Sequence, residues 1–170
     1  MFFFLNFQKH IFVDDNVDGT ICCRFFKDGK WVYVVIDDYL PIASNYTSRL
    51  SFARCFNPNE VWAPLCEKAY AKLHGGYASL VGGHTEEGLA DLTGGVAWKV
   101  KVQPDDVKSN KLWDLLSKAN QDDMVMGAAI IRQNVKNETG LGDTGLLYGH
   151  AYVKKIFFLI KFFREFYKHA

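Results

Sequence analysis

The sequence lacks a charge excess of either sign. Its 20 lysines and arginines almost balance 19 aspartates and glutamates, which leaves a formal net charge of +1. Phosphate binding favours a basic surface, so this balance argues against nucleic acid as the main partner. The 170 residues are 49% hydrophobic and 15% aromatic. That content predicts a folded domain with its own core rather than a disordered chain.

Patterns of metal binding and disulfide bonding are also missing. The four cysteines include no C-x-x-C pair, and no histidine stands at zinc-ligand spacing from them. Their spacing is not that of a small secreted scaffold. Cys22 and Cys23 are adjacent in a predicted strand and therefore point to opposite faces. We expect all four cysteines to be reduced and the protein to be cytoplasmic.

Neither end of the chain reads as a targeting or spanning segment. Residues 1–7, MFFFLNF, have no basic region and no small-residue cleavage site, and they are too short to cross a bilayer. The apolar and basic tail, 153–170, is interrupted by Lys161 and Arg164. It can be an interfacial helix on a membrane, or sequence outside the fold. We favour the second, because the change in composition falls immediately after Tyr152, so membrane contact through the tail is not favoured.

Residues 20–36 predict a β-hairpin. Two β-rich runs flank Lys27-Asp28-Gly29-Lys30, and Asp-Gly is a favoured two-residue turn. This turn pairs Phe26 with Trp31, Phe25 with Val32, Arg24 with Tyr33 and Cys23 with Val34. One face is then wholly apolar and belongs in a core: Ile21, Cys23, Phe25, Val32, Val34 and Ile36. Asp37 and Asp38 can cap the following turn or bind a cation, and we favour capping.

The stretch from Asn57 to Gly95 contains an amphipathic helix. Its apolar side chains recur at steps of three and four: Trp62, Leu65, Cys66, Ala69, Tyr70 and Leu73. We expect Asn57 or Asn59 to cap it and Glu60 to lie in its first turn. Pro64 cannot donate to the carbonyl of Glu60, so the helix either starts late or leaves that carbonyl free.

This stretch contains three glycine pairs, each of which predicts a sharp turn or a close approach of the backbone to another group: Gly75-Gly76, Gly82-Gly83 and Gly94-Gly95. We expect the first pair to end the helix. Further along, 97–102 alternates like a strand, and Asp105 and Asp106 read as turn residues. The remaining expected elements are a helix capped by Ser109 or Asn110 with Leu112, Leu115, Leu116 and Ala119 on its apolar side, a buried strand over 124–132, and an exposed loop over 133–145.

Four blocks of sequence resemble the protease core of the calpains, calcium-dependent cysteine endopeptidases with a papain-like fold. They are F-x-x-G-x-W-x-x-V-x-x-D-D-x-L-P at 26–41, EKAYAKLHGGY at 67–77, EEGLADLTGGV at 86–96 and GHAY at 149–152. The resemblance runs from about Gln8 to Tyr152. It implies an α+β fold, a partial papain-like calpain core with a β-hairpin and long helix followed by antiparallel strands. It assigns 1–96 to the C-terminal part of the first lobe and 97–152 to the N-terminal part of the second, with 153–170 outside the pattern.

The resemblance also implies site residues. His150 matches the catalytic histidine, whose task is to take the proton of a cysteine thiol. Without the family, a single histidine that opens a strand is more often structural. Glu60 matches an acidic ligand of the first-lobe calcium site, which makes calcium the implied cofactor and protein or peptide substrates the implied partners. The other ligands of that site belong to a segment this sequence lacks, so Glu60 reads more readily as a helix-start carboxylate.

Two catalytic motifs of the calpains are absent from the sequence. The family places its cysteine in Q-x-x-x-G-D-C-W and its asparagine in N-P-W-G, and neither occurs here. A papain-like nucleophile also needs a helix N-terminus to favour the thiolate. Cys22 and Cys23 fall in a predicted strand, Cys66 is in mid-helix, and Cys55 is in a loop without a supporting motif.

These observations favour a fragment of a calpain-like cysteine endopeptidase core that is inactive as the chain stands. The alternatives are a non-catalytic pseudoprotease that binds a peptide or partner protein, and a membrane adaptor that acts through its amphipathic tail. For a core fragment we expect exposed apolar surface, poor solubility or a covering partner, and neighbouring genomic sequence that encodes the missing motifs.

Overall fold

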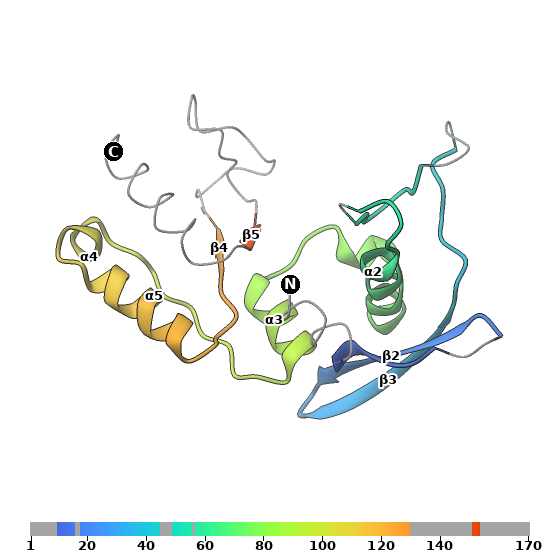
Figure 1. Cartoon of the computed structure of the whole chain (residues 1–170), viewed down its shortest axis with the longest axis horizontal. Helices are drawn as coiled ribbons and strands as arrows, with labels where there is room; N and C mark the ends of the chain where they lie inside the picture. Colours follow the sequence, from blue (N-terminus) through green and yellow to red (C-terminus); the bar gives the residue numbers. More distant parts are fainter. Residues whose placement is uncertain (1–9, 16–17, 45–48, 56, 130–150, 154–170) are drawn as a thin grey trace. The chain divides into compact units, whose positions relative to one another are not determined.

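The structure is a computed structural model that describes residues 10–15, 18–44, 49–55, 57–129 and 151–153. The chain divides into two compact units, Met1–Ala97 and Trp98–Ala170, each described here by itself. Helices and a three-stranded antiparallel sheet confirm the α+β class (Figure 1). The assignment of the two units to protease lobes stays a prediction.

A meander of three strands forms the sheet of the first unit. The strands β1 (Phe12–Asp15), β2 (Thr20–Lys27) and β3 (Lys30–Asp37) lie in the order β1-β2-β3. All four predicted pairs between β2 and β3 are confirmed. The turn residues Asp28 and Gly29 both have positive φ, at 51° and 76°, as a two-residue hairpin turn of the mirror-image class requires.

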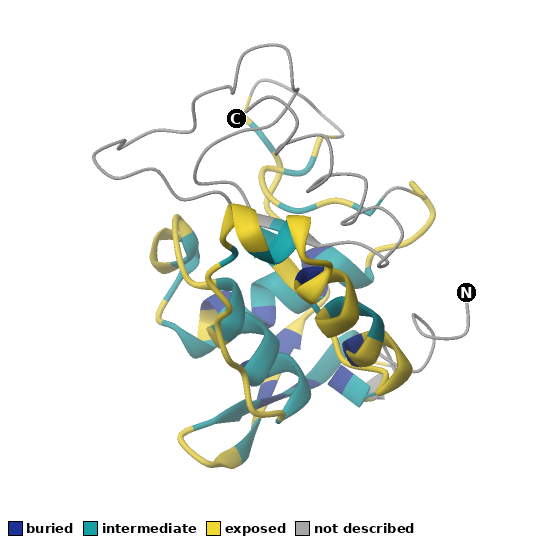
Figure 2. Cartoon of the chain, turned by 90° about the vertical axis from the view of Figure 1, so that its left-hand side faces the viewer, coloured by how far each residue is buried: buried dark blue, intermediate teal, exposed yellow. Residues whose placement is uncertain are grey.

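The core of the first unit lies between this sheet and a helix, α2 (Trp62–Leu73). The predicted apolar face of the hairpin is confirmed, because four of its six side chains are buried: Cys23, Phe25, Val34 and Ile36. Buried Ile11, Leu65 and Ala69 complete the cluster. Buried residues, dark blue in Figure 2, occur on both strands and helices. The ring of Phe25 packs against that of Tyr70 on α2, with centroids 5.3 Å apart.

Helix α2 begins late, as Pro64 allowed. Pro64 is the third residue of the helix, so its expected acceptor, the carbonyl of Glu60, lies outside. The capping prediction was wrong: the helix follows Val61, no side chain caps it, and Glu60 precedes the first turn. The short loop 57–60 satisfies its own polar groups instead; Asn59 N–H donates to Asn57 Oδ1 at 3.1 Å.

The helix ends where the first glycine pair predicted. Gly75 and Gly76 have φ of 93° and 146°, and Gly76 N–H donates to the carbonyl of Ala71 at 2.7 Å. Two lysines on α2 also reach the edge of the sheet. Lys72 Nζ donates to the carbonyl of Val35 at 2.7 Å, and Lys68 Nζ to that of Asp37 at 3.0 Å. Helix and edge strand are therefore joined by polar contacts as well as by the core.

The other two glycine pairs behave differently from each other. Gly94 ends a helix that the sequence did not predict, α3 (Thr85–Thr93), with φ of 71°. A Cβ at Gly94 would lie 2.8 Å from Trp31 Cζ2, so the expected close approach is present. Gly82 lies in a bend, but Gly82 and Gly83 have no positive φ and nothing near an added Cβ, so the chain turns there without a conformation that requires glycine. They follow a short 3-10 helix, η1 (Tyr77–Leu80), which was also not predicted.

The second unit contains helices α4 (Pro104–Lys108) and α5 (Lys111–Gln121) and strands β4 (Gly127–Ala129) and β5 (Ala151–Val153). The strand expected over 97–102 is wrong: the segment joins no sheet among the described residues. Asp105 and Asp106 are not loop residues but the first turn of α4. Asp106 Oδ2 accepts from Gln103 N–H at 2.9 Å and closes a capping box.

Helix α5 confirms the predicted apolar spacing only in part. Leu112 and Ala119 are buried, whereas Leu115 is exposed. Asn110 stands at the N-cap with a left-handed backbone but makes no side-chain cap bond, and Ser109 instead ends α4. The buried strand expected over 124–132 is wrong in its described part, because β4 has three residues and Met124 and Val125 before it are exposed.

Residues 130–132 and the loop expected over 133–145 lie outside the described residues. So does the tail from 154 onward. In the part of the chain that the structure describes, no helix is both long enough and apolar enough to cross a bilayer.

Candidate active site

The residue predicted to be catalytic, His150, lies outside the described residues, immediately before strand β5. That strand pairs antiparallel with β4, with Ala151 opposite Ala129 and Val153 opposite Gly127. Strand β5 begins within the G-H-A-Y block, at Ala151. The role of His150 stays a prediction.

Two of the four cysteines have thiols that the fold holds in the neutral form. Cys23 is fully buried in the core on β2, and burial raises its pKa to about 12, with Cys66 and Cys22 adding smaller contributions. Burial also raises the pKa of the Cys66 thiol on α2 to about 12, with a smaller contribution from Glu67. A nucleophilic cysteine needs the opposite shift, because the thiolate is the reactive form.

Cys22 and Cys55 occupy positions that do not activate a thiol either. Cys22 lies within β2 and Cys55 in the loop before α2. The helices whose starts lie among the described residues begin at Trp62, Tyr77, Thr85, Pro104 and Lys111, and none has a cysteine at its first position. All four thiols are free, as expected. Among the described residues, no cysteine therefore has the helix N-terminus that a papain-like nucleophile uses.

Glu60, the predicted calcium ligand, is engaged in local hydrogen bonds. Its Oε2 accepts from Trp62 Nε1 at 3.1 Å and its Oε1 accepts from Asn57 Nδ2 at 3.2 Å. No group of three or more His, Cys, Asp or Glu side chains that could hold a metal occurs within the described ranges. Calcium takes six to eight oxygen ligands, so Glu60 by itself makes no calcium site. What it does here is fix the loop that enters α2.

Asp37 caps the turn after the hairpin, as favoured from the sequence. Its Oδ1 accepts from Tyr39 N–H at 2.9 Å and from Lys68 Nζ at 2.5 Å. The hydrogen bond from Lys68 lowers the pKa of the Asp37 carboxyl, and that from the Tyr39 backbone lowers it further. The Lys68 ammonium also donates to the Tyr39 carbonyl at 2.6 Å. A lysine thus already supplies the positive charge that a bound cation would bring.

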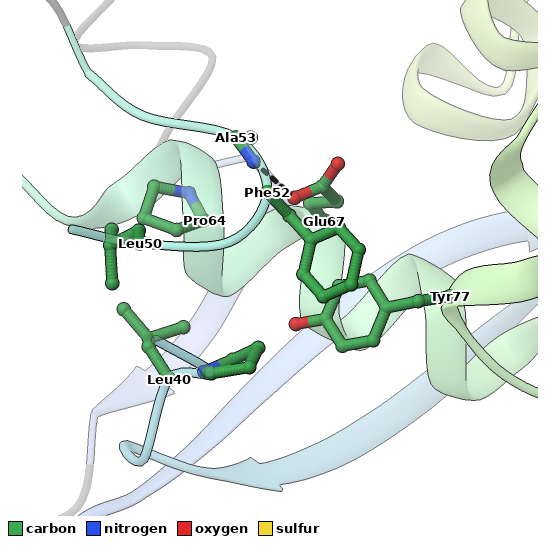
Figure 3. A pocket seen from close by; sticks show the side chains of 8 residues that line it. Leu40, Leu50, Phe52, Ala53, Pro64, Glu67 and Tyr77 are labelled. Atoms are coloured by element: carbon green, nitrogen blue, oxygen red, sulfur yellow. Dashed lines mark hydrogen bonds between the residues drawn. The ribbon is translucent and has the colours of Figure 1, made fainter. Parts of the chain in front are cut away.

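A small hollow beside α2 is filled by packing rather than shaped for a ligand (Figure 3). It leaves a cavity of only about 10 Å³, hardly room for one water molecule and far below the few hundred Å³ that small-molecule sites occupy. Phe52 and Tyr77 stack across it with ring centroids 3.9 Å apart. Glu67 Oε2 accepts from Ala53 N–H at 2.7 Å, the dashed line of Figure 3. These contacts anchor the loop before α2.

Sequence reasoning missed one cluster of titratable groups in the first unit. Asp91 on α3 is only 6% exposed, and its Oδ2 accepts from Tyr70 O–H at 2.7 Å and from Lys27 Nζ at 2.8 Å. His74 Nε2 lies 3.7 Å from the same oxygen. Burial, and then the bond to Asp91, raises the pKa of Tyr70. The partners stand up to 64 residues from Asp91, so no local sequence signal could have joined them.

Comparisons with known proteins point to one family. A family model described as calpain family cysteine protease matches residues 5–159, beyond the range over which the four motifs were recognised. The chain is 43% identical to Calpain-5 of Caenorhabditis elegans over 140 residues, 79% of this chain and 21% of that protein. It is 40% identical to Calpain-A of Drosophila melanogaster, over 82% of this chain and 16% of that protein.

A plant relative matches the same part of the chain. The calpain-type cysteine protease DEK1 of Arabidopsis thaliana is 36% identical over 141 residues, 81% of this chain and 6% of that protein. The chain therefore spans about a fifth or less of the length of these curated relatives.

Proposed function

Since the chain belongs to the calpain family of cysteine proteases, as the match over residues 5–159 shows, we propose that it carries a non-hydrolytic part of a calpain-type endopeptidase core. Its sequence holds the hairpin and helix blocks of the family and the histidine block, without the cysteine and asparagine motifs. As it stands, this chain does not cleave peptide bonds.

The environment of the cysteines carries this proposal. Burial raises the pKa of Cys23 and of Cys66 to about 12, and Cys22 and Cys55 lie away from any described helix start. Attack on a peptide carbonyl needs a thiolate beside a base. Loss of a triad nucleophile typically costs several orders of magnitude in rate, and none of the four cysteines, in the positions that the structure describes, replaces it.

His150 is the proposed general base of the parent enzyme. Its support is the G-H-A-Y block and the strand β5, which begins directly after His150. In a complete core, its imidazole would take the proton of the thiol and return it to the leaving amine. In this chain no cysteine stands in the family's cysteine motif, so the imidazole has no such thiol to deprotonate.

Calcium regulation and intracellular protein substrates are further proposals that rest on the family. Glu60 would supply one carboxylate to a first-lobe calcium site, and the other oxygen ligands would come from segments that this sequence does not contain. The four free thiols support a reducing compartment, the cytoplasm.

The test is a peptidase assay on the purified chain. We expect no hydrolysis of casein or of a fluorogenic peptide above a buffer blank, with or without calcium, while a catalytic calpain run in parallel cleaves both. Single replacements of Cys22, Cys23, Cys55 and Cys66 by alanine complete the design. Thiol-dependent activity that one of these replacements abolishes would overturn the proposal. A pulldown with casein-derived peptides then separates a silent core fragment from a peptide-binding pseudoprotease.

A further inference from the structure

The segment between α3 and α4, residues 95–101, lies on the surface. All of its residues are exposed, and it contains no helix, turn or strand (Figure 1). Three of its side chains are apolar and recur at every second position: Val96 is 90% exposed, Trp98 59% and Val100 50%. Single exposed apolar residues are common on protein surfaces. An alternating row that includes a tryptophan is not, and such rows mark interaction sites.

This linking segment has the composition of a strand that lacks a neighbour. Valine and tryptophan favour strands. In an extended chain, the three apolar side chains share one face, and Lys99 and Lys101 share the other. Among the described residues, however, the segment joins no sheet. An extended chain from another protein can complete such a strand by pairing with its main chain.

The two lysines select the partner. We propose that the linking segment is a docking site for an extended protein segment of complementary pattern, which pairs with it as a strand. The partner has apolar side chains on one face, which cover Trp98 and its two valine neighbours. On the other face it has carboxylates, which lie opposite Lys99 and Lys101. Opposite charges that face each other across two strands stabilise the pair.

A second copy of this chain fits the linking segment less well. When 96–102 pairs antiparallel with itself over its full length, Lys99 faces Lys99. A parallel pair in register also brings each lysine beside its own copy, and like charges in these positions destabilise two strands. Asp105 and Asp106 in the first turn of α4 limit the partner in another way. They repel carboxylates that extend beyond the segment, so a partner of about seven residues matches it.

The inference is independent of the proposed loss of hydrolysis, because no residue of 97–101 belongs to a catalytic motif. Its test is fluorescence anisotropy of the whole chain with three labelled heptapeptides. The probe VEVEVEV has the complementary pattern and reads the same in both directions, so it suits parallel and antiparallel pairing alike. VKVKVKV carries the opposite charges, and VVVVEEE has the composition of the probe without its alternation.

We expect saturable binding of VEVEVEV and at least about tenfold weaker binding of the other two peptides. Hydrogen exchange locates the site: bound VEVEVEV should slow exchange of the amides of 96–101 and leave those of α5 unchanged. No binding of VEVEVEV, or equal binding of either control peptide, overturns the proposal. Self-association that protects 96–101 without any peptide also overturns it, in favour of a second copy.

Two pairs of variants assign the binding to the linking segment. Lys101→Glu should weaken binding of VEVEVEV about three- to tenfold and strengthen that of VKVKVKV. Lys118→Glu makes the same charge change at an exposed position of α5 and should alter neither. Trp98→Ala should weaken binding of VEVEVEV about tenfold. Trp113→Ala is its control, because Trp113 is 44% exposed on α5. Equal losses within either pair contradict the assignment.

Discussion

The two units differ in how their described elements are held. Eight of the ten buried hydrophobic residues that the structure describes belong to the first unit, where a sheet and a helix close over a common cluster. The described part of the second unit contributes only Leu112 and Ala119, both on α5. Long-range packing thus holds the described elements of the first unit together. In the described part of the second unit, a capping box begins α4, whereas α5 begins without a side-chain cap.

The largest expected effect on stability comes from truncating a buried side chain in the core of the first unit. Phe25→Ala should lower the free energy of unfolding by about 3–5 kcal/mol, the usual cost of emptying a buried aromatic site. Leu112→Ala, the counterpart in the second unit, should cost about 2 kcal/mol, at the low end for a buried leucine. Chemical denaturation, monitored by hydrogen exchange, measures the free energy of unfolding of each unit. A smaller loss for Phe25→Ala than for Leu112→Ala would reverse the comparison.

Replacing one glycine from each of two glycine pairs offers the next test within the first unit. Gly94→Ala should cost about 2 kcal/mol, because it combines a positive φ with a Cβ placed 2.8 Å from Trp31 Cζ2. Gly83→Ala is the matched control, since its backbone is unstrained and no atom lies within 4 Å of an added Cβ. It should change stability by no more than about 0.5 kcal/mol. Thermal melting of both variants measures the two changes in stability. An equal loss of stability in Gly94→Ala and Gly83→Ala would contradict the close approach at Trp31.

The smallest effect concerns the turn after the hairpin. The pKa of Asp37 is lowered from 3.8 by Lys68 and the Tyr39 N–H, so the ionised carboxylate stabilises the folded state above the unfolded pKa. That contribution should fade as pH falls from about 4 through the folded pKa. Asp37→Asn should therefore melt slightly below wild type at pH 7, and the difference should shrink as the pH is lowered below 4. The exposed pair makes the difference small, and a difference that does not shrink on acidification would show another cause.

Sequence reasoning succeeded where neighbours along the chain complete an element. The Asp28-Gly29 turn fixes its own strand register, and the apolar spacing of α2 with Gly75-Gly76 fixes that helix. It failed over 97–102. The alternation of apolar and polar residues there predicts a strand, but a strand forms only beside a partner strand, which the local sequence does not reveal. It missed α3 because Gly88 in the middle of Thr85–Thr93 lowers the helix propensity, and the buried side chain of this helix is a charged one, Asp91.

The same distinction between local and long-range signals applies to the candidate site. The absence of the catalytic motifs is visible in the sequence, and so is the histidine block. The cluster around Asp91 is not, because Lys27, Tyr70 and His74 reach it through the fold. Glu60 could be placed near the start of α2 from the sequence, but its bonds to Trp62 and Asn57 depend on the conformation of the loop.

The lysines of α2 have a consequence for self-association. β3 is an edge strand of its sheet, and an unguarded edge is a template on which another chain can add a strand. Lys68 and Lys72 occupy the carbonyls of Asp37 and Val35 and bring positive charge to that edge. A second strand would have to displace both ammonium groups before it could pair. The helix that closes the core thus also protects the sheet from growing into an aggregate.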